Sequence, residues 1–260
     1  MSTDIFSSWS TNLKLWGIPP HILDAAPESP WIHPVSTFTP TGNLFVDTPS
    51  RLHALEVLPA DGSVLDIGCG GGRAAFGLTP PAASVIGVDH QQEMLDVFCA
   101  QASERHIACQ TILGDWPDVS AQTPSADVVV CHHVLYNVQD LAPFIRAMSD
   151  HAHRRVVVEI PRMHPLSSLS PLWKEFWNLD RPTSPNCSDA AELIRALGFD
   201  AHIEEFTQEI GIRPVTDDDV KFTRIRLCLS ADRDTDIRDF LENNPVTERH
   251  LAAIWWDTTN

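Results

Sequence analysis

The stretch Ser63–Arg73, Ser-Val-Leu-Asp-Ile-Gly-Cys-Gly-Gly-Gly-Arg, decides how the rest of the chain is interpreted. Val64, Leu65 and Ile67 form an apolar run that ends at once in glycines, which is typical of a buried parallel strand entering a tight turn and a helix. Glycine permits positive φ and close approach of a ligand to the main chain. The following helix N-terminus presents unpaired N–H groups. We therefore predict a loop that binds a polar or anionic part of a nucleotide-like ligand.

Two residues of this stretch narrow the choice of ligand. A dinucleotide fingerprint Gly-x-Gly-x-x-Gly beginning at Gly68 needs a third glycine where the chain has Arg73, so the pattern for NAD fails. Asp66 places a carboxylate just before the loop, and a carboxylate suits a cationic ligand better than a pyrophosphate. An NAD-dependent dehydrogenase is therefore disfavoured.

Length and charge limit the class of protein. The chain has 260 residues, which fits one large α/β domain with additions. Its 18 basic and 35 acidic side chains give a formal charge of −17, and no basic block interrupts the sequence. Because nucleic-acid binding needs clustered Lys and Arg, we expect no nucleic-acid partner.

Cysteines and hydropathy indicate the compartment. The six cysteines form no Cys-x-x-Cys pair, which favours reduced thiols in a cytosolic protein. No segment approaches the roughly 18 apolar residues of a membrane-spanning helix, and the first residues do not resemble a signal peptide. We expect a cytoplasmic protein without membrane contact. The oligomeric state is left open.

The pattern of elements divides the chain into two parts. Residues 1–46 are predicted to be a helical and irregular N-terminal extension, in which the aromatic-rich segment Trp31–Phe38 could cover the ligand site. Residues 47–260 alternate between strands and helices as in βαβ units. Within them, 161–187 is predicted to be an insertion or lid, and 216–243 a helical insertion.

Strands and helices follow from apolar periodicity. The predicted strands after the first are Ser84–Val88, Ile107–Leu113, Asp127–Cys131, Arg155–Ile160, Ala201–Ile210 and Leu251–Trp256. A helix over Pro49–Leu58 is expected to face inward with Leu52, Leu55 and Leu58. Another is expected to begin at Ser188 as its N-cap and to end near Leu197.

The run Val64–Gly72 and this order of elements resemble the class I S-adenosyl-L-methionine (SAM) methyltransferases over residues 48–256. More closely, Cys131–Val138, His153–Glu159 and the Pro-Leu-Trp at 171–173 resemble a set of small, uncharacterised actinobacterial methyltransferases. The resemblance implies a Rossmann-like seven-stranded sheet with its last strand antiparallel and helices on both faces. It also implies SAM as cofactor and S-adenosyl-L-homocysteine (SAH) as product.

The resemblance assigns roles to the glycine-rich loop and to the end of the second strand. Gly68, Cys69 and Gly70 would let the methionine carboxylate and the ribose approach the backbone, with no chemistry assigned to the thiol. Asp66 would neutralise the methionine ammonium group. Asp89, 21 residues past Gly68, would accept both ribose hydroxyls. We expect Asp89 to be functional because an acidic strand end has little structural purpose.

Further residues are expected around the adenine and the sulfonium. His90 would flank the adenine, Asp115 would accept its amino group, and Trp116 could cover the ring face. Gly-Asp is also ordinary turn chemistry, so a structural role for Asp115 stays open. Cys131 and His132, at the end of the fourth strand, would lie beside the methionine portion.

Several side chains could serve the methyl acceptor. His132, His133 or His164 could act as general base, because histidine titrates near neutral pH. Tyr136, the one tyrosine of the sequence, could orient a substrate. A structural role stays open for each of them.

No metal site is predicted. His132 and His133 are adjacent, so in a strand their side chains would face opposite ways. His151 and His153 lack carboxylate or cysteine companions.

The sequence therefore predicts a SAM-dependent methyltransferase that acts on a small-molecule acceptor by in-line displacement. The alternative is a non-catalytic SAM-binding sensor or partner protein, which would have a closed or missing acceptor pocket. A nucleic-acid methyltransferase is disfavoured by charge and by the lack of an Asn-Pro-Pro-Tyr-type motif. The acceptor pocket is expected to be enclosed and largely apolar, roofed by Trp31–Phe38 and Leu172–Trp177.

Overall fold

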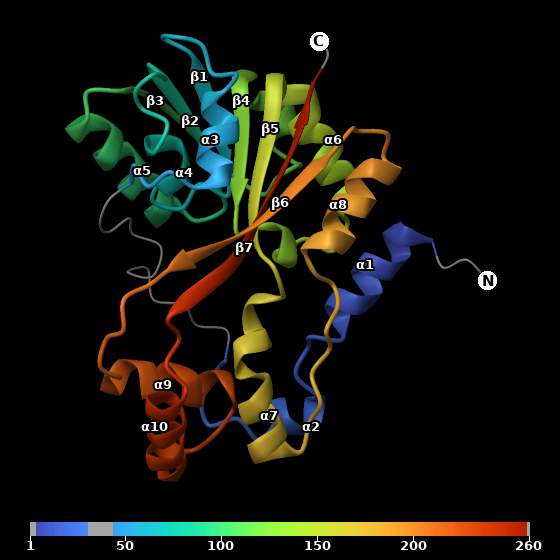
Figure 1. The fold of residues 1–260 in the computed structure, drawn as a ribbon, viewed down its shortest axis with the longest axis vertical. Helices are drawn as coiled ribbons and strands as arrows, with labels where there is room; N and C mark the ends of the chain where they lie inside the picture. Colours follow the sequence, from blue (N-terminus) through green and yellow to red (C-terminus); the bar gives the residue numbers. More distant parts are fainter. Residues whose placement is uncertain (1–3, 31–43, 259–260) are drawn as a thin grey trace.

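The computed structural model describes residues 4–30 and 44–258, which form a seven-stranded sheet between helices (Figure 1). The strand order is β3-β2-β1-β4-β5-β7-β6. The strands are β1 (Ser63–Ile67), β2 (Ser84–Asp89), β3 (Ala108–Leu113), β4 (Ala126–His132), β5 (Ala152–Pro161), β6 (His202–Glu209) and β7 (Glu248–Asp257). The pairs from β3 through β5 are parallel, whereas β7 is antiparallel to both β5 and β6. The predicted class I methyltransferase fold is confirmed.

Helices cover both faces of the sheet. They are α1 (Ile5–Lys14), α2 (Pro20–Leu23), α3 (Pro49–Leu55), α4 (Arg73–Phe76), α5 (Gln92–Glu104), α6 (Leu141–His151), α7 (Ser170–Trp177), α8 (Cys187–Ala196), α9 (Asp217–Arg226) and α10 (Asp234–Asn243). Helices α3, α4 and α5 pack on one face, and α1, α6 and α8 on the other (Figure 1). None of the helices in residues 4–30 and 44–258 is long and apolar enough to cross a membrane.

The central strand β4 has a continuous apolar run, Val128–Cys131, because helices cover both of its faces. Val128 and Val130 are buried in the cluster beneath α3, α4 and α5. Val129 and Cys131 point to the opposite cluster, beneath α1, α6 and α8. A strand covered on both faces buries every side chain, so it loses the alternating pattern of a half-exposed strand.

Beyond the carboxyl ends of the parallel strands lies a second, smaller core. Ile22, Leu172, Trp173, Leu227 and Cys228 form this cluster. The helices that carry or adjoin these residues, α2, α7, α9 and α10, come from distant parts of the sequence and gather below the sheet (Figure 1). We call α2, α7, α9 and α10 the helical cap.

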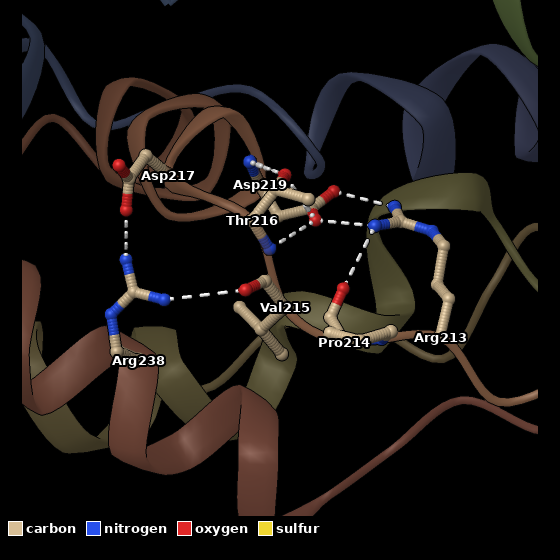
Figure 2. Close-up of polar contacts among 7 residues, drawn as sticks. All are labelled: Arg213, Pro214, Val215, Thr216, Asp217, Asp219 and Arg238. Carbon is tan, nitrogen blue, oxygen red and sulfur yellow. Dashed lines mark hydrogen bonds and ion pairs between the residues drawn. The ribbon is translucent and has the colours of Figure 1, made fainter.

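A polar network fixes the entry of the chain into the cap (Figure 2). Arg213 makes two hydrogen bonds of 2.6 Å to the two carboxylate oxygens of Asp219. Thr216 is the N-cap of α9 and forms a capping box with the same Asp219. Arg238 on α10 donates to Asp217 and so ties the two helices together. The start of α9 is therefore set by charge-assisted hydrogen bonds.

Two local predictions were wrong. Helix α3 ends at Leu55 instead of Leu58, and Leu52 is 44% exposed because Ser50 and Ala54 form the buried face. Leu55 and Leu58 do pack on the core, as predicted. Helix α8 is capped by Asn186, whose side-chain oxygen accepts the N–H of Ser188. Asparagine is among the strongest N-cap residues, and it begins the helix two residues earlier than a Ser188 cap would.

Candidate active site

One cavity of about 1,940 Å³ lies at the carboxyl ends of the parallel strands. Successive strands supply its wall through Gly68, Asp89, Asp115, His132 and Glu159. Ligands of open α/β sheets bind at this edge, where the strand order reverses on either side of β1 and β4. The cavity is therefore the candidate active site.

The loop after β1 is built around glycines with left-handed backbone. Gly68 has φ +69°, and its N–H donates to the carbonyl of Val88 at 2.8 Å. A Cβ added to Gly68 would lie 2.5 Å from Cγ2 of Val134, closer than any side chain tolerates. Gly68 thus satisfies both a dihedral and a steric requirement. The loop main chain remains accessible from the cavity.

Asp89 joins this loop to the end of β2. Its Oδ2 accepts the N–H of Gly70 and its Oδ1 accepts the N–H of Gln91, both at 3.0 Å. The expectation that an acidic strand end has little structural purpose was wrong, because this carboxylate holds two loops. Each carboxylate oxygen has a second lone pair, so Asp89 can still accept from a ligand in the cavity.

Asp66 is a buried carboxylate in the cavity wall. Its Oδ2 accepts the N–H of Ala75 at 3.2 Å. Burial raises the pKa of Asp66 to about 7, and the nearby Asp89 charge acts in the same direction. A bound cation would reverse this effect by favouring the ionised carboxylate. The site is therefore arranged to receive a positively charged group.

His90, Asp115 and Trp116 stand in the wall on the side of β2 and β3. His90 is exposed, with Nδ1 at 3.6 Å from Oδ1 of Asp89. The indole of Trp116 donates to the carbonyl of Phe144 at 3.2 Å, which fixes the ring against α6. This side of the cavity thus offers a carboxylate, an exposed imidazole and a fixed aromatic ring.

Two residues predicted to touch the ligand or substrate do not lie in the cavity wall. Cys131 is fully buried and faces the α6 side of β4, because alternate residues of a strand point to opposite faces. Tyr136 is 4% exposed, its ring stacks on Trp9, and its hydroxyl donates to the carbonyl of Pro161 at 2.9 Å. Both predictions were wrong. Cys69 does contribute to the wall, but burial raises the pKa of its thiol far above the usual range.

At the opposite end of the cavity, His133 meets a buried carboxylate that the sequence analysis did not single out. Nε2 of His133 lies 3.3 Å from Oε1 of Glu159, which is 7% exposed. Ser50 donates its hydroxyl to the other oxygen of Glu159. Burial alone would raise the pKa of Glu159, but His132, His133 and Ser50 outweigh it and lower that pKa to about 2. Glu159 is therefore ionised across the working pH range.

His132 and His133 both approach this carboxylate, contrary to the prediction that they face opposite ways. Strand β4 ends at His132, and His133 takes φ +63°, which turns the chain out of the strand. Burial lowers the pKa of His132, although Glu159 partly opposes this. Within residues 4–30 and 44–258, no three His, Cys, Asp or Glu side chains are grouped to hold a metal ion.

His164 lines the cavity but is held by its surroundings. Nδ1 accepts the N–H of Leu166 at 3.2 Å, and the ring stacks on Trp16 with centroids 4.1 Å apart. Burial, with a smaller effect from Arg181, lowers the pKa of His164 to about 4. The neutral ring then carries its proton on Nε2, so His164 is suited to donate a hydrogen bond and poorly suited to act as a base.

The predicted roof and lining of the acceptor pocket need correction. Leu172–Trp177 belongs to the core of the helical cap, and the wall instead takes Pro165 and Ser167 from the preceding connection. The other predicted segment, Trp31–Phe38, lies outside the described residues. The described wall is largely apolar, but near β4 and β5 it carries more polar groups than expected, namely Ser50, His132, His133, Glu159, Arg162 and His164.

Comparisons with known proteins agree with this geometry. Residues 64–154 match a family described as a methyltransferase domain. The ubiquinone biosynthesis O-methyltransferase of Leptothrix cholodnii is 32% identical over 130 residues, which make up 46% of this chain and 52% of that protein. The match thus spans about half the length of this curated relative.

Solved structures share the fold at low identity. Magnesium protoporphyrin IX methyltransferase of Synechocystis PCC 6803, solved with bound SAH, has a TM-score of 0.50 at 17% identity and covers 96% of each chain. The YcgJ protein of Bacillus subtilis has a TM-score of 0.52 at 18% identity and covers 81% of this chain and 98% of its own. At such identities the likeness concerns the fold alone.

The chain therefore has a Rossmann-like fold, and its cavity contains a buried carboxylate, Asp66, that is suited to a cationic group. The family match covers residues 64–154, and the solved structures share the sheet topology of the class I SAM-dependent methyltransferase fold. The O-methyltransferase relative is proteobacterial, so it does not support the closer resemblance to actinobacterial proteins.

Proposed function

We propose that this protein transfers a methyl group from SAM to a small-molecule acceptor. One observation carries the proposal: a single cavity joins the glycine loop, Asp66 and Asp89 at one end to the pair of His133 and Glu159 at the other. The first end suits a cationic nucleoside, and the second suits removal of a proton. The non-catalytic alternative predicts a closed or missing acceptor space, whereas this cavity continues past β4 to β5 and β7.

The residues of the first end fit SAM. Asp66 would face the ammonium group, because a buried carboxylate with a raised pKa gains most from a nearby cation. Asp89 has free lone pairs for the ribose hydroxyls, and Gly68 leaves the main chain open. Asp115 and Trp116 would hold the adenine. When bound, SAM supplies a methyl group activated by its sulfonium.

The residues of the second end would handle the acceptor proton. Glu159 accepts from Nε2–H of His133, which leaves Nδ1 as the basic nitrogen. We propose that Nδ1 of His133 takes the proton of an acceptor hydroxyl or amine, while ionised Glu159 stabilises the imidazolium. Nε2–H of His164 would donate to the acceptor and orient it. His132 is the less suitable base, since burial lowers its pKa.

Further parts of the proposal concern substrate and context. The relative's name supports oxygen as the methylated atom. Residues 161–187 and 216–243, which include α7, α9 and α10 of the cap, would form the acceptor side of a domain spanning 47–260. The extension 1–46, which includes α2, would precede this domain. We also keep as proposals the actinobacterial affinity, a cytoplasmic location and the absence of a nucleic-acid partner. The six free cysteines support a cytoplasmic location, and the charge of −17 supports the absence of a nucleic-acid partner.

The test is a turnover assay with the full chain. Purified protein is incubated with SAM and a panel of small hydroxyl, phenol, amine and carboxylic acid compounds, and SAH formation is measured. We expect acceptor-dependent SAH release from at least one hydroxyl compound and about 100-fold slower release from Glu159→Gln. Tight SAH binding without turnover on any acceptor class would favour the sensor instead.

A further inference from the structure

Two exposed cysteines lie close together outside the cavity. Cys99 is on α5 and Cys109 is on β3, and their sulfur atoms are 3.9 Å apart. The other four cysteines are buried. Strand β3 is at the edge of the described sheet, so small oxidants in solvent can reach both thiols.

The surroundings give the two sulfurs different roles. Oγ1 of Thr111 lies 3.8 Å from Sγ of Cys99, where a hydroxyl can donate to a thiolate and stabilise it. Burial, together with the neighbouring Cys99, raises the pKa of Cys109. Because burial disfavours the Cys109 thiolate, Cys99 is the better suited of the two to attack an oxidant, and Cys109 is suited to resolve the product.

We propose that Cys99 and Cys109 form a reversible intrachain disulfide when the protein meets hydrogen peroxide. The Cys99 thiolate attacks one peroxide oxygen, the O–O bond breaks, and the hydroxide that leaves takes up a proton to become water. The sulfenic acid at Cys99 is then attacked by the sulfur of Cys109. The S–S bond forms, and the sulfenic hydroxyl leaves as water with the proton of Cys109. Two thiols are oxidised and one peroxide is reduced to two waters.

The bond would join two elements that lead to the nucleoside end of the cavity. Helix α5 begins just after Asp89 and His90, and β3 ends just before Asp115. Both elements already pack against each other, so the disulfide locks the observed arrangement rather than disrupting it. This consequence for the site rests on the proposed function, whereas the formation of the bond does not.

The test uses the full chain with hydrogen peroxide, followed by non-reducing digestion and mass spectrometry. We expect a peptide linking Cys99 to Cys109, removed by dithiothreitol and absent from Cys99→Ser and Cys109→Ser. Cys228→Ser, a control at a buried cysteine, should keep the link. The oxidised wild type should unfold about 5 °C higher than the reduced protein.

Three outcomes would overturn the proposal. They are disulfides mainly between copies, over-oxidation of each thiol without a link, or a link that forms as fast in urea-unfolded chain as in folded protein. None of these depends on SAM, so this failure is distinguishable from failure of the proposed function. SAH titration of the oxidised protein checks the consequence: affinity should change less than about threefold, and loss of binding would show that the bond disrupts the site.

Discussion

Oε1 of Glu159 lies 3.3 Å from Nε2 of His133, and the other oxygen of the same carboxylate accepts the hydroxyl of Ser50. The carboxylate is thus held from α3 on one side and presents a fixed acceptor to the imidazole on the other. A buried carboxylate held in this way fixes both the orientation and the tautomer of a histidine. This relationship supports the proposed role of His133 as the base.

The first prediction removes that carboxylate charge. Glu159→Gln should lower kcat about 100-fold, because His133 loses the group that stabilises its protonated form. The dissociation constant for SAH should change less than about twofold, since Glu159 lies at the acceptor end. Turnover assays and calorimetry give the two values.

A matched control comes from a second Glu–His pair in the cavity wall. Glu248 lies 3.2 Å from Nε2 of His250, but both side chains are about half exposed. Glu248→Gln should leave kcat nearly unchanged. Equal losses of kcat in Glu159→Gln and Glu248→Gln would mean that the total charge of the cavity matters and that the contact between Glu159 and His133 does not.

The second prediction concerns the pH dependence of stability through Asp66. The folded-state pKa of about 7 lies above the usual value of 3.8. The contribution of this group to the free energy of unfolding is therefore fully present below about pH 4 and lost as pH rises through 7. The side chain in the Asp66→Asn variant cannot ionise, so the variant does not lose this contribution. Between pH 5 and pH 8, the free energy of unfolding of the variant should therefore rise by about 1–4 kcal/mol relative to that of the wild type.

Urea unfolding of ligand-free protein at the two pH values checks this prediction. The same variant should bind SAH more weakly, since it loses the charge opposite the ammonium group. A stability difference from wild type that is identical at pH 5 and pH 8 would contradict the assignment.

The third prediction separates the two roles of Asp89. Asp89→Ala removes the acceptor of two main-chain N–H groups and of the ribose, so SAH binding should weaken by about 1.5–3 kcal/mol. Thermal stability should fall as well, because the Gly70 and Gln91 amides lose their partner. Asp96→Ala, on the exposed face of α5, is the control and should leave the affinity unchanged. An unaltered dissociation constant for Asp89→Ala would place the ribose elsewhere.

The fourth prediction tests the steric role of Gly68. Gly68→Ala should weaken SAH binding more than tenfold, because its Cβ would lie 2.5 Å from Cγ2 of Val134. Adding Val134→Ala should restore part of the affinity by removing the clash. The left-handed dihedral still costs about 1–2 kcal/mol, so recovery should be incomplete. If the changes in SAH affinity caused by Gly68→Ala and Val134→Ala simply add in the double variant, then the contact with Val134 is not what weakens binding in Gly68→Ala.

Much of the fold could be predicted because its signals are local. One βαβ unit contains the apolar run of β1, the glycines after it and the acidic residues near the ends of β1 and β2. Their short separation in the sequence therefore determines which of them lie close together. Strands β5 and β7 are longer than predicted, since β5 includes His153 and β7 includes Arg249, which pairs with Gln208 of β6, despite the polarity of both residues. Pairing with a neighbouring strand overrides local polarity there.

The acceptor end could be predicted less well because it depends on contacts distant in sequence. Glu159 could be noticed from one signal in the sequence, a carboxylate within the apolar run 156–161 of β5. Its partner Ser50 lies 109 residues away, and nothing in the spacing links the two. Tyr136 looked like a substrate contact because it is polar and follows β4, but a single turn of 3₁₀ helix directs its ring into the core.

The aromatic residues of 172–177 were misassigned for a similar reason. A high density of apolar residues in a segment indicates that the segment is buried, but it does not indicate which surface the segment packs against. Here Leu172 and Trp173 bury against Ile22 and Leu227, segments that the chain brings together only through the cap.

The most direct test of the central claim is isothermal titration calorimetry of the full chain with SAH, without added metal, alongside Asp66→Asn and NAD as controls. We predict one SAH per chain with micromolar or tighter affinity, clearly weaker binding by Asp66→Asn, and no heat with NAD. A well-folded protein that binds no SAH, or that binds NAD in its place, would contradict the assignment of this cavity.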